Sequence, residues 1–380
     1  MPEGRKLRIG VMGRILSYHG FGVRTYLAGM LNGMLDAGIE HEVVVFLGAD
    51  QAPPAQLAGR GLEFQTVSPA PTNALRRMVW DHLRIGVACR RHDIDVLFAP
   101  AHIRPLYAPC PVVVTVHDMM YHLFPEDWSR GDRFYFRLGV NLLTRRAAGI
   151  AADSRSTAED VIRILGISEE CVEVVYPGVP NGFYPRPKAE ITPVLEAYGV
   201  RRPYIFYAGS FHPRKNVGAL VKAFEAVSGD IPHQLVIGSE PGWDYPDVIQ
   251  LIEESLARDR ILLTGFIPET DLPRFYSGAD LFVFPSRYEG FGFPVLEALA
   301  CGCPTITTGA SSLPEVAGEA CVLVEPGDTS QLAEAILLVV SDDAKRAMMR
   351  GKAVEQADRF TWICAAQGMV RLLENAASAR

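Results

Sequence analysis

The sequence predicts an α/β protein with two doubly wound domains in tandem. The chain has 380 residues, a length that suits two domains. Short apolar runs alternate with longer helix-like stretches, which is typical of parallel sheets covered by helices. This alternation stops at a proline-rich segment and then starts again. Hydrophobic residues make up 48% and charged residues 21% of the chain, as in an ordinary globular protein.

The first half of the chain has the pattern of one such domain. Continuous runs of Val, Ile and Leu are typical of parallel strands that are buried on both faces. Strands are therefore expected at residues 7–13, 42–47, 95–99, 112–116 and 149–153. A helix is expected near residues 23–37, after a glycine-rich turn that follows the first strand.

Prolines mark the junction between the domains, because proline lacks an N–H group and interrupts both helices and sheets. They are Pro177, Pro180, Pro185, Pro187, Pro193 and Pro203. We therefore expect an N-terminal domain over residues 1–180 and a C-terminal domain over residues 181–360.

The second domain repeats the alternation. Strands are expected at residues 204–208, 234–238, 260–264, 281–285 and 304–307, with helices at 217–227 and 293–300. The last expected helix, at residues 362–375, follows a polar break. We expect the final segment, about residues 361–380, to cross back to the first domain.

Charge is distributed unevenly along the chain. The formal net charge is −7, which gives no support for a nucleic-acid-binding protein. Residues 1–150 hold 17 Lys and Arg against 13 Asp and Glu, a balance of +4, which leaves −11 for the remainder. The basic first half indicates either an anionic partner or drift in surface composition. Seven scattered cysteines indicate reduced thiols rather than a disulfide framework.

A cytoplasmic location is expected. The apolar run near the start is too short for a signal peptide, and no run reaches the ~18 residues that span a bilayer. Two stretches combine basic and apolar residues, at 75–91 and 130–146. They are either ordinary surface helices or a peripheral contact with the inner face of a membrane.

The most informative stretch is residues 285–304, PSRYEGFGFPVLEALACGCP. Gly290 and Gly292 allow close approach of the backbone to a ligand, and the helix start that follows attracts anions. Glu289 lies on this loop and Glu297 in the helix, eight residues later. Carboxylates in these places can accept hydrogen bonds from sugar hydroxyls. Glu297 lies among apolar residues, where a solvated surface charge is not expected.

This stretch resembles the Glu-x7-Glu signature of retaining glycosyltransferases of family 4, which have the GT-B fold. The resemblance implies two Rossmann-like domains that face each other across a cleft. It implies that Glu289 contacts the donor sugar and Glu297 the nucleotide ribose. The backbone at Gly290, Phe291, Gly292 and Phe293 would meet the sugar and the diphosphate.

The resemblance extends to residues 208–216, AGSFHPRKN, after the first strand of the second domain. It implies that Arg214 and Lys215 neutralise the donor diphosphate, with Ser210 beside them. This role suits a leaving group that gains charge as the glycosidic bond breaks. Further on, Gly265, Phe266 and Ile267 stand where the backbone of the family reads the nucleotide base.

In the first domain, Gly20 and Gly22 follow the first strand, where the family has a glycine-rich loop beside the donor phosphate. A dinucleotide-binding fingerprint would need a third glycine where Thr25 stands, which disfavours a dehydrogenase. His117 ends a predicted strand, and the resemblance places it near the donor sugar as a catalytic residue with Glu289, Arg214 and Lys215.

No metal site and no cofactor are expected. Asp118 and His122 lie close to His117 in sequence, but nothing supplies a clear further ligand. Asp93 and Asp95 resemble an Asp-x-Asp metal site, yet they open a predicted strand of the first domain.

The predicted activity is transfer of a sugar from a nucleotide-sugar donor to a glycan or lipid-linked acceptor, with retention of configuration. The run HDMMYHLFPE, with AGSFHPRKN, resembles bacterial mannosyltransferases that build surface polysaccharides, so GDP-mannose is the expected donor. UDP-glucose and UDP-N-acetylglucosamine are alternatives. So are a protein that hydrolyses or epimerises a nucleotide sugar and one that only binds it.

Overall fold

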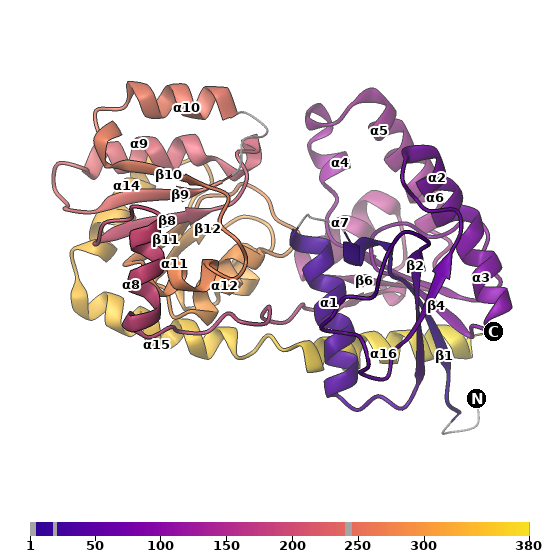
Figure 1. Ribbon diagram of the computed structural model, residues 1–380. Helices are drawn as coiled ribbons and strands as arrows, with labels where there is room; N and C mark the ends of the chain where they lie inside the picture. The colour runs from indigo at the N-terminus through magenta and orange to yellow at the C-terminus, as the bar shows by residue number, and fades with distance from the viewer. Residues whose placement is uncertain (1–4, 18–20, 240–244, 380) are drawn as a thin grey trace. The chain divides into compact units, whose positions relative to one another are not determined.

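The computed structural model describes residues 5–17, 21–239 and 245–379, and it divides the chain into two compact units (Figure 1). Unit 1 comprises Met1–Gly178 and Phe360–Arg380, and unit 2 comprises Val179–Arg359. The division falls at the start of the proline-rich segment, and the final segment of the chain lies with unit 1.

Unit 1 contains a sheet of seven parallel strands in the order β3-β2-β1-β4-β5-β6-β7. The strands are β1 (Arg8–Met12), β2 (Glu42–Gly48), β3 (Glu63–Val67), β4 (Val96–Ala99), β5 (Val112–Val116), β6 (Gly149–Ala152) and β7 (Val172–Val174). The five predicted strands are confirmed. The two that the sequence did not reveal, β3 and β7, are the edge strands. Both carry polar residues because they are only partly buried.

Helices cover both faces of this sheet. They are α1 (Phe21–Asp36), α2 (Ala74–Val79), α3 (Ile85–Arg91), α4 (Met120–Leu123), α5 (Arg130–Phe134), α6 (Asn141–Thr144), α7 (Arg155–Leu165) and α16 (Trp362–Ser378). Single π-helical turns join α2 to α3 at Trp80–Arg84 and α5 to α6 at Tyr135–Val140. Short 3-10 turns lie at Arg14–Ser17, Pro125–Asp127 and Glu169–Cys171.

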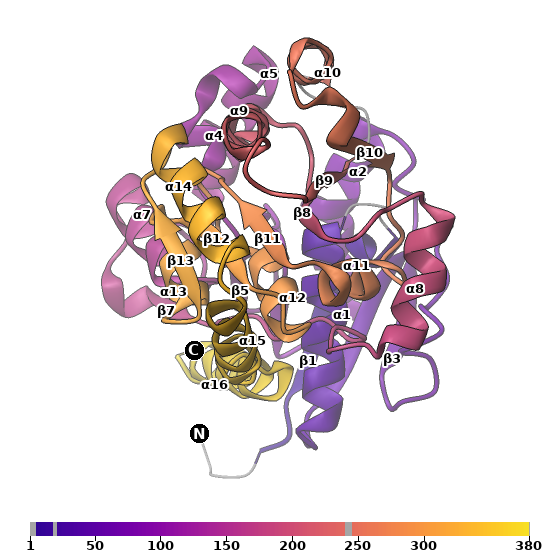
Figure 2. The same cartoon turned by 90° about the vertical axis from the view of Figure 1, so that its left-hand side faces the viewer.

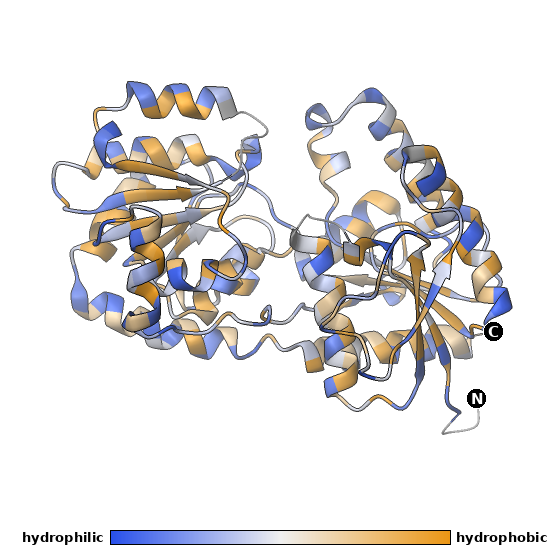
Figure 3. Cartoon of the chain, in the orientation of Figure 1, coloured by the Kyte–Doolittle hydropathy of each residue, from blue (hydrophilic) through white to orange (hydrophobic). Residues whose placement is uncertain are grey.

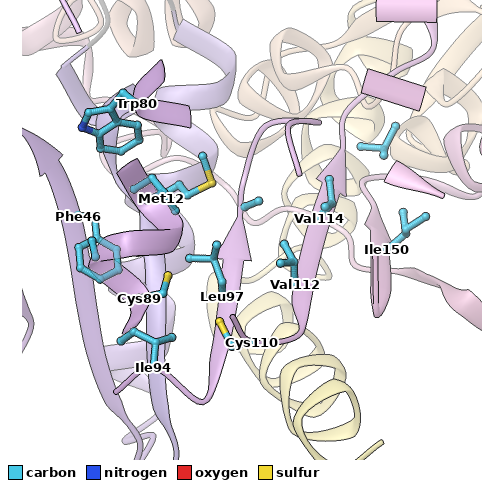
Figure 4. Close-up of a cluster of buried hydrophobic side chains, with 14 of the residues drawn as sticks. Met12, Phe46, Trp80, Cys89, Ile94, Leu97, Cys110, Val112, Val114 and Ile150 are labelled. Atoms are coloured by element: carbon cyan, nitrogen blue, oxygen red, sulfur yellow. The ribbon is translucent and has the colours of Figure 1, made fainter. Parts of the chain in front are cut away.

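The core of unit 1 lies on the two faces of its sheet. On one face, strand residues such as Phe46, Leu97 and Val114 pack with Trp80 and Cys89 (Figure 4). On the other face, α16 contacts α1 and the strands β4, β5 and β6. The last helix of the chain is therefore a structural layer of the first unit.

Unit 2 contains six parallel strands in the order β10-β9-β8-β11-β12-β13. They are β8 (Tyr204–Ala208), β9 (Gln234–Gly238), β10 (Ile261–Gly265), β11 (Leu281–Phe284), β12 (Thr305–Thr308) and β13 (Cys321–Val324). The five predicted strands are again confirmed. The strand that the sequence did not reveal, β13, lies at an edge.

Helices also cover the sheet of unit 2, with α9 and α14 on one side and α11 and α12 on the other (Figure 2). The helices are α8 (Lys188–Ala197), α9 (Val217–Val227), α10 (Tyr245–Glu254), α11 (Leu272–Gly278), α12 (Phe293–Ala300), α13 (Leu313–Ala317), α14 (Thr329–Val340) and α15 (Asp343–Ala357). Two 3-10 turns lie at Pro213–Lys215 and Arg258–Arg260. The predicted helices at 217–227 and 293–300 are confirmed.

Hydropathy agrees with this layering. The strands are hydrophobic along most of their length, and the helices alternate between hydrophobic and hydrophilic stripes (Figure 3). Continuous apolar strands between amphipathic helices confirm the predicted doubly wound fold. Within the described ranges, no helix has the length and apolar character needed to cross a membrane.

The strand order fixes where a ligand can bind. The order reverses between β1 and β4 in unit 1, and between β8 and β11 in unit 2. Doubly wound sheets bind ligands at the carboxyl ends of the strands on either side of such a switch point. The loops after β8 and β11 are the two motif-bearing segments of unit 2.

Candidate active site

Two motifs far apart in sequence meet at the switch point of unit 2. Arg214 and Lys215 lie in the 3-10 turn Pro213–Lys215, shortly after β8. Glu289 lies on the loop after β11, the strand that pairs with β8. A backbone hydrogen bond joins the two loops, because the N–H of Arg287 donates to the carbonyl of Arg214 at 2.8 Å.

The carboxylate of Glu289 is the centre of this cluster. Its Oε1 accepts hydrogen bonds from Arg214 Nη1 at 2.7 Å, Lys215 Nζ at 2.6 Å and Ser286 Oγ at 2.6 Å. The residue is buried, with 7% of its surface exposed. Within the described part of the chain, its Oε2 has no hydrogen-bond partner. One oxygen is saturated and the other is available to a ligand hydroxyl.

The electrostatics of the cluster favour a bound anion. Burial acts to raise the pKa of Glu289, but the charges of Lys215 and Arg214 outweigh it and hold that pKa below its ordinary value. One ionised carboxylate thus faces two cations, which leaves an excess of positive charge. The Nε of Arg214 is buried without a hydrogen-bond partner among the described residues. An unsatisfied guanidinium donor is costly, and an anionic ligand would satisfy it.

The loop that carries Glu289 is held in a defined shape. The N–H of Glu289 donates to Ser311 Oγ at 2.8 Å, and Ser312 Oγ lies 2.9 Å from the carbonyl oxygens of Glu289 and Phe291. Gly292 precedes α12 with φ of 104°, a conformation that favours glycine. A Cβ atom there would also lie 2.8 Å from Leu313. The backbone of this loop therefore leads into the N-terminus of α12, where anions are favoured.

Glu297 lies in the second turn of α12. Its Oε2 accepts a hydrogen bond from the hydroxyl of Tyr276 at 3.0 Å. Burial raises the pKa of Glu297 to about 7, although the hydrogen bond from Tyr276 acts in the opposite direction. A ligand that donates hydrogen bonds to this carboxylate would stabilise its ionised form.

The remaining predicted residues of unit 2 lie along the same edge of the sheet. Ser210 is exposed after β8, and its carbonyl accepts a hydrogen bond from the hydroxyl of Tyr207 at 2.9 Å. Gly265 ends β10 with φ of 72°. Phe266, which follows, is 45% exposed, whereas Ile267 is buried. Gly290 and Phe293 belong to the loop and first turn already described, and the rings of Phe291 and Phe293 meet edge to face.

In unit 1, His117 follows β5 and is locked by its neighbours. Its Nδ1 lies 2.6 Å from Asp153 Oδ2, and its Nε2 lies 2.7 Å from the carbonyl of Pro100. Both ring nitrogens therefore face acceptors. The predicted contact of His117 with the donor sugar stays a prediction, and a bond from the ring would have to replace one of these two.

The charge state of His117 follows from the same contacts. Burial acts to lower its pKa, but the carboxylate of Asp153 and the carbonyl of Pro100 outweigh it, so the pKa is raised. Both ring nitrogens can donate only in the protonated form. The neighbouring His102 is the opposite case, because burial and the charge of His117 lower its pKa to about 3. His102 Nε2 accepts a hydrogen bond from the backbone N–H of His117.

The glycines of the first domain are only partly described. Gly20 lies outside the described residues. Gly22 lies in the first turn of α1 and is exposed, with nothing within 4 Å of where its Cβ would be. Its predicted contact with the donor phosphate stays a prediction.

The metal candidates of unit 1 have other partners. His122 Nε2 contacts Asn141 Nδ2 at 2.6 Å, and Asp95 accepts from Arg5 and from the N–H of Arg8. Where the chain is described, no group of three or more His, Cys, Asp or Glu side chains is placed to hold a metal ion.

Several site residues were not singled out as functional from the sequence. Ser286, Ser311 and Tyr276 hold Glu289 and Glu297 in place, and Asp153 holds His117. Asp153 ends β6, the strand that pairs with β5. Its position after an apolar strand was therefore a usable signal, since carboxyl ends of parallel strands meet at one edge. The serines and Tyr276 had no such signal.

Two family models together match most of the chain. The family described as "Glycosyltransferase Family 4" matches residues 22–181, and "Glycosyl transferases group 1" matches residues 196–356. The chain is 30% identical to the O-antigen chain mannosyltransferase B of Escherichia coli over 253 residues, which are 66% of either protein. It is 29% identical to the serotype-specific mannosyltransferase WbdA of Escherichia coli over 279 residues, 70% of this chain and 34% of WbdA.

This chain thus spans about two thirds of the length of the first relative and a third of the second. A solved structure of similar fold is that of HepE from Anabaena in complex with UDP-glucose. It has a TM-score of 0.75 and 21% identity, and the match covers 97% of this chain and 99% of that one.

Proposed function

Because this chain belongs to glycosyltransferase family 4 and has two Rossmann-like domains of the GT-B type, we propose that it transfers a sugar from a nucleoside-diphosphate donor to an acceptor. The observation that carries the proposal is the cluster of Arg214, Lys215 and Glu289 at the switch point of unit 2. It combines surplus positive charge with one unpaired carboxylate oxygen.

Each group has a role in the proposed reaction. The diphosphate leaves with the bonding electrons of the glycosidic bond and gains negative charge, which Arg214 and Lys215 stabilise. Oε2 of Glu289 accepts a hydrogen bond from a hydroxyl of the donor sugar. Its lowered pKa and its three hydrogen bonds at Oε1 suit a positioning carboxylate rather than a nucleophile. Glu297 accepts hydrogen bonds from the ribose hydroxyls.

GDP-mannose is the proposed donor, and retention of configuration is the proposed outcome. Two relatives are named mannosyltransferases, and family 4 enzymes retain configuration. A solved neighbour holds UDP-glucose, so uridine donors are the alternative. A thermal-shift screen of nucleotides decides between them, since a ligand at a hundred times its dissociation constant stabilises by ~2.7 kcal/mol. Stronger stabilisation by UDP than by GDP would contradict the choice of GDP-mannose.

The proposed acceptor is a glycan or a lipid-linked sugar, and no nucleic acid and no essential metal take part. Transfer is expected to persist when a chelator is present. Loss of activity with the chelator and recovery with a divalent ion would contradict the metal-independent reaction.

The test of the function is a transfer assay with variants of the diphosphate cluster. Arg214→Ala and Lys215→Ala are expected to raise the barrier for transfer by ~2–4 kcal/mol, by analogy with the removal of a transition-state donor. Binding of the free nucleoside should change little, because it carries no phosphate for Arg214 and Lys215 to contact. Near-normal turnover in both variants would refute the assignment.

A further inference from the structure

Unit 1 contains a basic pocket that has no part in the proposed donor site. It has a volume of about 620 Å³ and is lined by side chains from α4, α5, the π-helical turn Tyr135–Val140, α6 and α7. Figure 1 shows α4, α5 and α6 in the unit that contains the N-terminus. Four of the lining residues are arginines, namely Arg130, Arg133, Arg137 and Arg145.

The charge of this pocket is not balanced by the protein. Within the described residues, no acidic side chain lines it, and none of the four guanidinium groups forms an ion pair or a hydrogen bond. Arg133 is half-buried, whereas Arg130, Arg137 and Arg145 are exposed. Four like charges around one concavity repel one another, and an anion that enters it would relieve this repulsion. Arginine is suited to phosphate because its planar group binds two oxygens at once.

The pocket also has an apolar side. Phe134 is 68% exposed and Leu142 is 56% exposed, although both side chains are large and hydrophobic. Both line the pocket, together with Ile164 and the buried Leu165. Apolar surface beside an anion site is complementary to a ligand that carries a phosphate on a hydrocarbon chain.

The pocket connects to the strand-end site of the same unit. His122, at the end of α4, lines the pocket. Its ring packs against Tyr121 at 5.0 Å between centroids, and Tyr121 packs against His102 at 6.1 Å. His102 in turn accepts from the backbone of His117. A ligand anchored in the pocket would therefore lie on the side of unit 1 that holds His117.

We propose that this pocket binds the phosphate group of a lipid-linked acceptor, with the start of the hydrocarbon chain against Phe134 and Leu142. The role as acceptor site rests on the proposed function, whereas the binding of a lipid diphosphate does not. Four unpaired arginines suit a group with more than one negative charge, so a diphosphate on an isoprenoid-like chain is the class of ligand. A free phosphate or an anionic bilayer is the competing source of the same chemistry.

The test is calorimetric titration of the full-length protein with farnesyl diphosphate and with inorganic diphosphate at about 0.15 M salt, where the screening length is about 8 Å. Wild type is expected to bind farnesyl diphosphate at least about tenfold more tightly than inorganic diphosphate, because the chain buries apolar surface. The variant Arg133→Gln/Arg137→Gln should bind farnesyl diphosphate about a hundredfold more weakly, about tenfold for each charged hydrogen-bond donor lost.

The control variant Arg90→Gln/Arg91→Gln removes the same charge from exposed arginines at the end of α3. It should bind farnesyl diphosphate within about threefold of wild type, because general attraction between surface charges is screened. An equal loss in both double variants would overturn the proposal, as would equal affinity for the two diphosphates.

Two further measurements separate the competing sites. Arg214→Ala should leave binding of farnesyl diphosphate unchanged. If this variant no longer binds farnesyl diphosphate, the ligand occupies the donor site instead. Vesicles of phosphatidylglycerol test the bilayer. If they bind through Arg133 and Arg137 while farnesyl diphosphate does not bind, the pocket contacts a membrane surface and the proposal is wrong. A protein without transferase activity that still shows the expected binding would refute the proposed function alone.

Discussion

At the residue scale, one carboxylate and two cations share a cluster at the switch point of unit 2. The family resemblance assigns Glu289 to the donor sugar, and Arg214 and Lys215 to the diphosphate. The structure makes them one cluster, in which the carboxylate neutralises part of the charge that is meant for the donor. Removing any member therefore changes the electrostatics of the others, and single variants must be interpreted with that in mind.

The two glutamates should separate in a binding experiment. Glu297→Gln should weaken binding of the free nucleoside diphosphate by ~1–3 kcal/mol, since it removes the acceptor of the ribose hydroxyls. Glu289→Gln should slow sugar transfer but bind the nucleoside diphosphate at least as well as wild type, because Arg214 and Lys215 lose their counter-charge. Calorimetry beside steady-state rates measures both.

Glu334→Gln is the matched control for both variants, because Glu334 is exposed on α14 in the same unit. It should bind the nucleoside diphosphate and transfer the sugar as wild type does. If Glu289→Gln loses nucleotide binding while Glu297→Gln keeps it, the donor is bound the other way round, with its ribose at Glu289 and its sugar at Glu297.

The pKa of Glu297 also predicts a pH dependence. Burial raises this pKa to about 7, so the folded, ligand-free protein holds a proton that the unfolded chain has already lost. The stability that this proton contributes is lost as the pH rises through about 7. Ribose hydroxyls favour the ionised form, so nucleoside diphosphate affinity should increase from about pH 6 to about pH 8.

Titration calorimetry across this range, with wild type and Glu297→Gln side by side, isolates the contribution of Glu297. Titration of the ligand phosphate affects both proteins equally. A pH dependence in the variant that is as steep as in wild type, or steeper, would contradict the assignment.

At the element scale, small residues allow two helices to pack closely. Trp362, at the start of α16, lies directly against α1. A Cβ atom at Gly29 would lie 2.1 Å from the Trp362 ring, and one at Gly33 would lie 2.2 Å from its carbonyl oxygen. The glycines of α1 therefore lower helix propensity but permit this contact.

Gly29→Ala should thus destabilise the protein by ~1–3 kcal/mol through overpacking. Gly22→Ala is the matched control on the same helix, because nothing lies within 4 Å of its Cβ position. It should be neutral or slightly stabilising in urea unfolding. Equal effects of the two substitutions would show that Trp362 does not pack against Gly29.

At the scale of the whole molecule, the chain returns at its end to the unit where it began. The segment Phe360–Arg380 belongs to unit 1, and α16 contacts β4, β5 and β6. Unit 1 can therefore complete its core only after α16 has been made. Unit 2, from Val179 to Arg359, is continuous in sequence.

This arrangement predicts which unit a core substitution in α16 destabilises. Leu373 is fully buried, so Leu373→Ala should cost ~2–5 kcal/mol through the cavity that it leaves. Amide hydrogen exchange should accelerate in the strands of unit 1 and stay unchanged in those of unit 2. Ile363→Ala is the control, because Ile363 is 42% exposed on the same helix. Acceleration across both sheets would show that the units unfold together.

The sequence by itself determined the fold class, ten strands of the two sheets, and the loop at Glu289 with the helix that carries Glu297. Buried parallel strands are continuous apolar runs, so they are visible without the structure. The edge strands β3 and β7 were not, because their exposed sides carry polar residues, and the four-residue edge strand β13 was missed as well. The tertiary structure alone decided which side chains meet. Strand order places Arg214 beside Glu289 and Asp153 beside His117. Such contacts depend on register and strand order, which local patterns do not encode.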